Sequence, residues 1–181
     1  MAVDGFEHRA GTHCGSVAMR DVLAWAGIDL SEPMVFGLGS GLGFYYLKSD
    51  HISPSRQIMG RSAALETNAA EALGLELTEH RTGDPEEGWL GVREALVQGR
   101  PVIVQCDLSE LPYWETETPF NGHRIVVAGF DEETDTVEVA DTHFEGLQTI
   151  ERATLQRARA SEAPPSMDDD FAWWELAPDE P

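Results

Sequence analysis

Apolar residues in the first hundred positions recur at the spacing of a helix. Met19, Val22 and Leu23 form one such stripe, which begins after a capping residue, Thr12, and stops before Gly27. Other stretches show the same kind of stripe or a helix-starting sequence in which proline follows a capping residue. The pattern predicts helices over residues 12–26, from Ser31 onward, over 62–73 and over 84–98.

The second half of the chain instead contains short apolar runs bounded by turn residues, which is typical of strands. The predicted strands cover residues 101–108, 123–130, 136–141, 147–150 and 171–176, with a short helix near 153–160. Helices followed by strands predict an α+β fold in which N-terminal helices pack on an antiparallel sheet. We expect one domain over residues 1–162, and a linker with a terminal strand over 163–181.

Between the first two helices and the third, residues 36–44 carry glycine at every second position. This spacing is neither that of a dinucleotide-binding loop nor that of a P-loop, so phosphate binding is not expected. We interpret the segment as a loop whose backbone packs closely beside a cleft or forms a wall of the substrate site.

Charge narrows the classes of partner. The chain has 33 acidic and 12 basic residues, a net charge of −21, so a nucleic acid would be repelled. An acidic, lysine-poor surface indicates a salt-adapted protein, and a site for a cationic substrate is the alternative interpretation.

No apolar run is long enough to cross a membrane, and the N-terminus does not resemble a signal peptide. Two cysteines are too few for a disulfide framework, which predicts a cytoplasmic location.

Cys14 is the first candidate for chemistry because it falls in the first turn of the first predicted helix. The positive end of the helix dipole lowers a thiol pKa there and favours the nucleophilic thiolate. The N–H groups of that turn, including that of Gly15, could also hold an oxyanion. The alternative is that Cys14 is a small buried side chain.

The predicted hairpin over residues 123–141 adds a possible base to this thiol. If its turn centres near residue 132, His123 and Asp141 face each other across two strands. An aspartate that orients an imidazole, and an imidazole that takes a thiol proton, are what nucleophilic catalysis needs. A histidine at a strand end and an aspartate in a turn are the simpler interpretations. Neither a metal-binding spacing nor a cofactor motif is present, so we expect no metal and no cofactor.

Several stretches in order resemble the N-terminal domain of the butirosin biosynthesis acyltransferase family. They are His8 with His13-Cys14-Gly15, residues 32–44, Pro101-Val102-Ile103-Val104, Asp107-Leu108, Pro112-Tyr113, Gly122-His123 and Val139-Ala140-Asp141. The resemblance implies a papain-like cysteine peptidase fold in which Cys14, His123 and Asp141 are the catalytic residues. His8 stands where papain-like enzymes carry the glutamine of the oxyanion hole, so the resemblance suggests that role for it.

The same resemblance implies an activity. A member of this family transfers an aminoacyl group from a carrier-protein thioester to the amine of a small molecule. For this chain we therefore expect a thioester donor, carried by an acyl carrier protein, and a small-molecule amine acceptor, with a Cys14 thioester between them. A cysteine peptidase or amidase with the same residues, and a non-catalytic binding module of this fold, are the alternatives.

Overall fold

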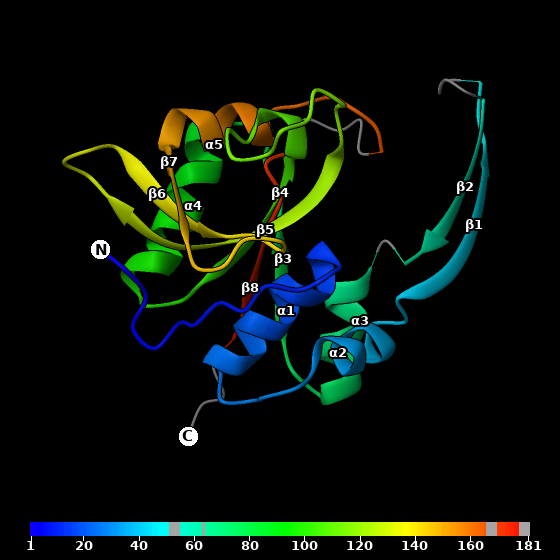
Figure 1. Ribbon diagram of the computed structural model, residues 1–181, viewed down its shortest axis with the longest axis horizontal. Coiled ribbons are helices and arrows are strands. Elements are labelled where there is room, and N and C mark those ends of the chain that lie inside the picture. The colour runs from blue at the N-terminus through cyan, green and yellow to red at the C-terminus, as the bar shows by residue number, and fades with distance from the viewer. Residues whose placement is uncertain (51–54, 63, 166–169, 178–181) are drawn as a thin grey trace.

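The computed structural model describes residues 1–50, 55–62, 64–165 and 170–177. A six-stranded antiparallel sheet, in the order β3-β8-β4-β5-β6-β7, forms its centre, and β1 and β2 form a separate two-stranded sheet (Figure 1). The helices are α1 (Cys14–Trp25), α2 (Glu32–Leu38), α3 (Leu65–Leu73), α4 (Pro85–Val97) and α5 (Arg152–Arg159). The strands are β1 (Leu42–Lys48), β2 (Arg56–Arg61), β3 (Leu77–His80), β4 (Val102–Asp107), β5 (Asn121–Asp131), β6 (Thr136–Ala140), β7 (Gln148–Glu151) and β8 (Trp173–Leu176).

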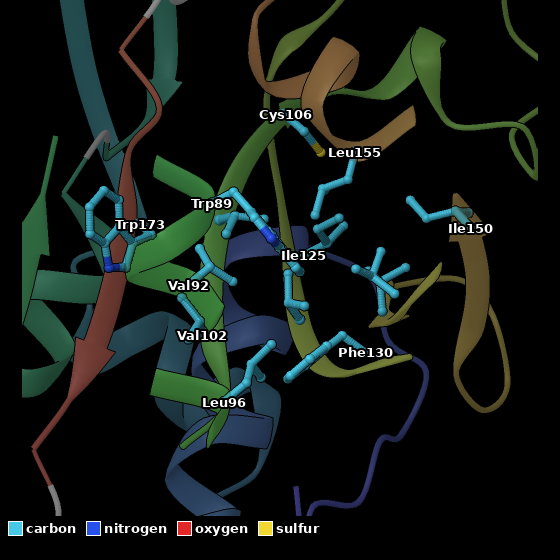
Figure 2. Close-up of a cluster of buried hydrophobic side chains, with 14 of the residues drawn as sticks. Trp89, Val92, Leu96, Val102, Cys106, Ile125, Phe130, Ile150, Leu155 and Trp173 are labelled. Carbon is cyan, nitrogen blue, oxygen red and sulfur yellow. The ribbon is translucent and has the colours of Figure 1, made fainter. Parts of the chain in front are cut away.

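Two hydrophobic clusters, one on each face of the large sheet, hold these elements together. On one face, side chains from α4 and α5 pack on inward-pointing residues of the central strands; Leu96, Leu155 and Ile125 are among them (Figure 2). On the other face, α1 packs through side chains such as Met19, with Val126 of β5 in the same cluster. The predicted α+β arrangement, with N-terminal helices on an antiparallel sheet, is confirmed.

Helix α1 begins one residue later than the predicted N-cap implies. Its N-cap is His13 rather than Thr12, because the His13 ring accepts a hydrogen bond from the backbone N–H of Ser16. The backbone N–H of Thr12 instead donates to the carboxylate of Glu32. Cys14 is consequently the first residue of the helix. The predicted end is confirmed, because Gly27 follows the helix with a φ of +86°.

The start of α4 is also confirmed, since the carboxylate of Asp84 accepts hydrogen bonds from the backbone N–H groups of Glu86 and Glu87. Helix α3 begins at Leu65, three residues after the predicted start. The strand prediction missed β3, a four-residue strand with no wholly buried position. The strand predicted at 171–176 forms as β8, which pairs with both β3 and β4. Residues 166–169 of the predicted linker lie outside the described residues.

The glycine-rich segment is not the loop that its composition indicates. Helix α2 extends to Leu38 and β1 begins at Leu42, so much of the segment is regular structure. Strands β1 and β2 project from the body as a two-stranded arm (Figure 1). Large apolar side chains of the arm are exposed, with Phe44 at 74% and Ile58 at 68%. A strand with no buried face lacks the apolar–polar alternation by which strands are predicted.

The hairpin of β5 and β6 has a different register from the predicted one. Val127 pairs with Val139 and Val126 with Ala140, and a bulge separates Val127 from the turn. Strand β6 ends at Ala140, so His123 and Asp141 are not directly opposite each other as predicted. Both residues nevertheless keep the predicted face, because a register shift of two residues preserves the direction of alternating side chains.

No helix in the described part of the chain is long and apolar enough to cross a membrane.

Candidate functional site

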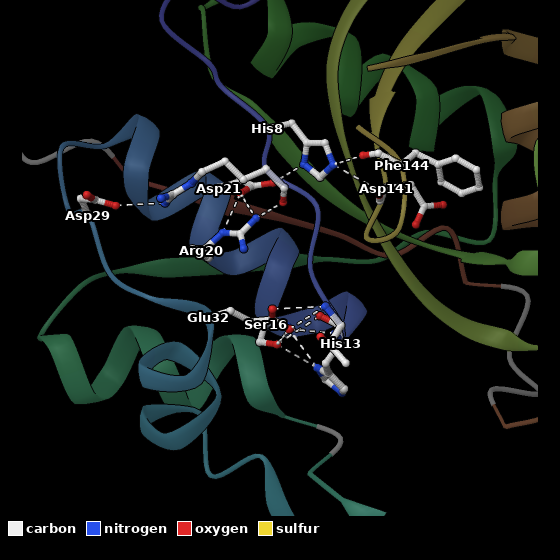
Figure 3. A network of polar contacts seen from close by, with 11 residues as sticks. His8, His13, Ser16, Arg20, Asp21, Asp29, Glu32, Asp141 and Phe144 are labelled. Carbon is white, nitrogen blue, oxygen red and sulfur yellow. Dashed lines mark hydrogen bonds and ion pairs between the residues drawn. The ribbon is translucent and has the colours of Figure 1, made fainter. Parts of the chain in front are cut away.

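Cys14 occupies the N-terminus of α1, where the local hydrogen bonds fix the start of the helix. The His13 ring caps the helix by accepting a hydrogen bond from the backbone N–H of Ser16. The carboxylate of Glu32 accepts from the backbone N–H of His13 at 2.8 Å (Figure 3). The Cys14 side chain is partly buried and forms no disulfide. The thiol therefore lies at the positive end of the helix dipole, next to backbone N–H groups that have no partner within the helix.

Strand β5 and the end of β6 bring the predicted base and its partner to this thiol. The Nε2 atom of His123 lies 2.8 Å from Oδ1 of Asp141. The His123 ring is also hydrogen-bonded to the Cys14 side chain, which leaves Nδ1 as the ring atom that faces the sulfur. Cys14, His123 and Asp141 thus form one connected row, although residues far apart in sequence supply it.

Two aromatic side chains complete the surroundings of Asp141. The Tyr113 hydroxyl donates to Oδ2 at 3.0 Å, and the Trp114 indole Nε1–H donates to the same oxygen at 2.8 Å. The Trp114 ring also stands edge-on to the His123 ring, with centroids 5.7 Å apart. No contact of these two residues with the candidate site was predicted, because a loop between strands offers no periodic spacing from which to infer one. The family pattern, which includes Pro112-Tyr113, is the one signal that marks this segment.

Electrostatics favour a charged Cys14–His123 pair. Burial alone would raise the pKa of Cys14, but the hydrogen bond and charge of His123, and then Arg124, lower it below its ordinary value. Burial would lower the pKa of His123, but its hydrogen bonds to Asp141 and Cys14 raise that pKa to about 9. The two shifts have opposite signs, which is the condition for a thiolate and an imidazolium to coexist near neutral pH.

Arg124 is a second positive charge near the sulfur. Its guanidinium lies 4.4 Å from the centre of the Trp174 ring and 3.3 Å from the carboxylate of Glu66. Glu66 in turn packs against the first turn of α1, where a Cβ on Gly15 would come within 2.9 Å of its carboxylate. Glycine at position 15 therefore lets a buried acidic side chain approach the helix, and Arg124 balances that negative charge beside Cys14.

We predict that Arg124→Gln raises the pKa of Cys14, because the charge that offsets Glu66 is removed while the hydrogen-bonding length of the side chain is largely kept. The pH midpoint of Cys14 alkylation, followed by mass spectrometry, should move upward by about half to one unit. Arg93→Gln is the matched control, since Arg93 pairs with exposed Glu132. The backbone N–H of residue 124, which also lowers the Cys14 pKa, is kept in this variant, so an unchanged midpoint would show that the guanidinium charge does not act on the thiol.

His8 does not lie where the resemblance suggests. Its Nδ1 atom is 2.6 Å from Oδ2 of Asp21, and its Nε2 atom is 3.1 Å and 2.9 Å from the carbonyl oxygens of Asp141 and Phe144 (Figure 3). Both ring nitrogens are therefore engaged with the protein, and neither can donate to a substrate oxyanion. These contacts contradict the suggested role of His8 in the oxyanion hole.

The other candidate sites do not belong to the row of Cys14, His123 and Asp141. Cys106 is fully buried in β4, and burial together with the Asp141 charge raises the pKa of its thiol well above the ordinary value. A cavity of about 340 Å³ borders Trp89 and Arg152, and it does not reach Cys14. Among the described residues, no group of three or more histidine, cysteine, aspartate or glutamate side chains is arranged to hold a metal ion.

Three solved structures share the fold over nearly the whole chain. A C39-like peptidase from Bacillus anthracis has a TM-score of 0.62 and 14% identity, covering 97% of this chain and 96% of that one. The peptidase domain of Streptococcus ComA, a bi-functional ABC transporter, has a TM-score of 0.59 and 14% identity, covering 96% and 98%. A double-glycine motif protease from an AMS/PCAT transporter, in complex with the leader peptide, has a TM-score of 0.53 and 16% identity, covering 98% and 97%.

These likenesses confirm the predicted papain-like cysteine peptidase fold. No curated protein matches the sequence. The family model described as butirosin biosynthesis protein H, N-terminal, matches residues 13–142, which is well over half of the chain and includes Cys14, His123 and Asp141. The chain therefore belongs to the butirosin biosynthesis protein H family, through the N-terminal domain of that family.

Proposed function

We propose that this chain is a cysteine-dependent acyltransferase, with Cys14 as nucleophile, His123 as acid and base, and Asp141 as the group that orients His123. The observation that carries the proposal is the connected row from the Cys14 thiol through His123 to the Asp141 carboxylate. Membership of a biosynthetic family supports transfer of an acyl group, and the papain-like fold supports a thiolate mechanism.

The first half-reaction forms the acyl-enzyme. The Cys14 thiolate attacks the carbonyl carbon of a thioester donor, and the helix N-terminus, including the N–H of Gly15, stabilises the oxyanion. The donor carbon–sulfur bond breaks as the new one to Cys14 forms, and the imidazolium of His123 gives its proton to the departing thiolate. A donor bound to an acyl carrier protein fits this chemistry, because its acyl group is already a thioester.

The second half-reaction releases the acyl group. An amine of a small-molecule acceptor attacks the Cys14 thioester, neutral His123 takes the amine proton, and the bond to Cys14 breaks to give an amide. Water in place of the amine would make the same site a peptidase or amidase, an alternative that the peptidases among the solved structures support. A non-catalytic module is disfavoured, because opposite pKa shifts of a thiol and a buried histidine in direct contact are typical of active sites.

The test is intact-mass spectrometry with an N-acetylcysteamine acyl thioester, a small donor that needs no carrier protein. We expect a covalent adduct on Cys14 that discharges faster when millimolar amine is added than in buffer, with amide as the product. Adduct formation with discharge to the free acid alone, whatever amine is offered, would assign hydrolysis. An unmodified Cys14 after prolonged incubation would contradict the proposal.

The pKa shifts predict a bell-shaped dependence of acylation on pH. The thiolate is present only above the lowered pKa of Cys14, so the acid limb should lie below the ~8.5 of an ordinary thiol. The imidazolium that protonates the departing thiolate is lost as pH rises through the His123 pKa of about 9, and this loss sets the alkaline limb. Rates of single-turnover acylation between pH 5 and 11 measure both limbs. A single rise near the ordinary thiol pKa, with no alkaline fall, would contradict the charged pair.

A further inference from the structure

His8 lies outside the reacting row, yet it joins the two elements that supply the row. Its side chain is only 1% exposed. Through Nδ1 it contacts Asp21 of α1, the helix that begins with Cys14, and through Nε2 it contacts the carbonyl oxygens of Asp141 and Phe144 (Figure 3). The helix that positions the nucleophile and the turn that positions the orienting carboxylate are therefore bridged by one ring.

The contacts of the ring fix its protonation. A carboxylate oxygen and two carbonyl oxygens are acceptors only, so each ring nitrogen must carry a hydrogen to bond to them. A neutral imidazole has one N–H, and its other nitrogen would turn a lone pair toward an acceptor. Both nitrogens of His8 are thus donors, and the ring is an imidazolium. Its buried charge is compensated at 2.6 Å by Asp21.

The charged groups around the ring support this state. From α1, Asp21 accepts through its other oxygen from the Nε and Nη2 atoms of Arg20, at 3.0 Å and 2.8 Å. Arg20 also donates to the backbone carbonyl of Arg9, which ties down the segment that carries His8. From the turn, the Asp141 side chain points to His123, and exposed His143 contacts the Gly11 carbonyl at 3.2 Å. Asp21 is thus the anion that faces His8 directly.

We propose that protonated His8 is a positioning residue, which locks the Asp141–Phe144 turn onto α1 and thereby holds the Asp141 carboxylate behind His123. The role rests on the proposed function, since it concerns the same row. It also accounts for a histidine at the position where the fold otherwise suggests an oxyanion donor. A neutral ring would set a lone pair against Asp21 or against the turn carbonyls, so loss of the proton releases the turn.

The pKa direction agrees with the geometry. Burial would lower the pKa of His8, but the hydrogen bond and charge of Asp21, followed by the two carbonyls, raise it above its ordinary value. This bridge between α1 and the Asp141–Phe144 turn, the His8 clamp, is therefore complete below the ordinary histidine pKa and is lost as pH rises through the raised one. Removing Asp21 reverses the balance, because the burial that remains disfavours the charged ring.

The first experiment reads the ring directly in the full-length protein. Nitrogen-15 NMR of histidine-labelled protein at pH 7.5 should show two protonated ring nitrogens for His8, with the signal assigned by its loss in His8→Gln. A second signal, that of His123, gives the pKa of the base. We expect a His8 signal typical of imidazolium, and a neutral-ring pattern at this pH would overturn the proposal without any reference to activity.

The second experiment connects the clamp to the row. In His8→Gln and Asp21→Asn, we expect acylation of Cys14 by the small thioester to slow by on the order of 10- to 100-fold, as for a small displacement of a catalytic group. We also expect the His123 pKa to fall from about 9, a change that loss of stability alone would not produce. Arg9→Gln is the control, since Arg9 forms an exposed pair with Asp29.

The outcomes separate the two proposals. Wild-type rates and an unshifted His123 pKa in both variants would overturn the positioning role while leaving acyl transfer intact. No acylation of the wild-type protein would count against the proposed function, yet the NMR state of His8 and the His123 pKa would still decide the clamp. If His8→Gln fails to fold, the change of the His8 signal in Asp21→Asn assigns it instead, so the wild-type NMR measurement still tests the imidazolium.

Discussion

Asp141→Asn is expected to slow acylation of Cys14 by on the order of 10⁴-fold, as an asparagine in the same role does in serine triads, although the side chains have almost the same shape. The reason lies in the partners of the two carboxylate oxygens. Oδ2 accepts from the Trp114 indole, which can only donate, and Oδ1 accepts from His123. An asparagine has one acceptor oxygen, and the indole requires it.

The amide of an asparagine at position 141 would therefore turn its NH₂ group toward His123. Nε2 of His123 would then have to accept, which moves the ring proton to Nδ1, the atom that faces Cys14. That tautomer cannot take the thiol proton, and the lost negative charge also lowers the His123 pKa from about 9. The alternative amide orientation leaves a buried indole N–H without an acceptor, at a cost of about 1–3 kcal/mol.

A double variant separates this tautomer effect from general damage. Trp114→Phe removes the obligate donor, so the amide oxygen in Asp141→Asn/Trp114→Phe can accept from His123 again, with Tyr113 able to accept from the NH₂ group. We expect the double variant to acylate at least tenfold faster than Asp141→Asn alone, in a single-turnover assay with the small thioester. A double variant that is slower than the single one would contradict the tautomer explanation.

Cys14→Ala should abolish covalent acyl transfer, because the thioester intermediate forms on the Cys14 sulfur. Intact-mass spectrometry should detect no adduct, and amide formation should fall to the rate of the uncatalysed reaction. Cys106→Ala is the matched control, since Cys106 is fully buried in β4 and its thiol pKa is raised. That control should acquire the adduct at the wild-type rate. An adduct that persisted in Cys14→Ala and vanished in Cys106→Ala would reverse the assignment.

Local patterns were sufficient to predict most of the elements and to mark Cys14 as a candidate nucleophile. The helix that starts at Cys14 and the buried strand at residues 102–107 leave clear signals, because each has a buried face or stripe and a defined end. The cap was misplaced by one residue because a histidine ring, which is not a usual N-cap, accepts the Ser16 N–H. The arm of β1 and β2 was missed because its exposed side chains follow no amphipathic period.

Contacts between distant residues were harder to predict. The approach of His123 to Asp141 was anticipated with a register wrong by two residues. The turn between Asp131 and Thr136 lies further along the chain than predicted, and the bulge in β5 offsets that shift only in part. The donors Tyr113 and Trp114 come from a loop, and the bridge from His8 to Asp141 spans 133 positions. Such contacts depend on how the elements pack, so a pattern within one element does not contain them.

The measurement that tests the central claim most directly is alkylation of Cys14 by iodoacetamide across pH, in the wild-type protein and in His123→Ala. We predict rapid labelling of the wild type with a midpoint well below the ~8.5 of a free thiol, and a higher midpoint with slower labelling at neutral pH in the variant. Slow labelling at alkaline pH only, identical in the two proteins, would contradict an activated Cys14 and favour a non-catalytic module.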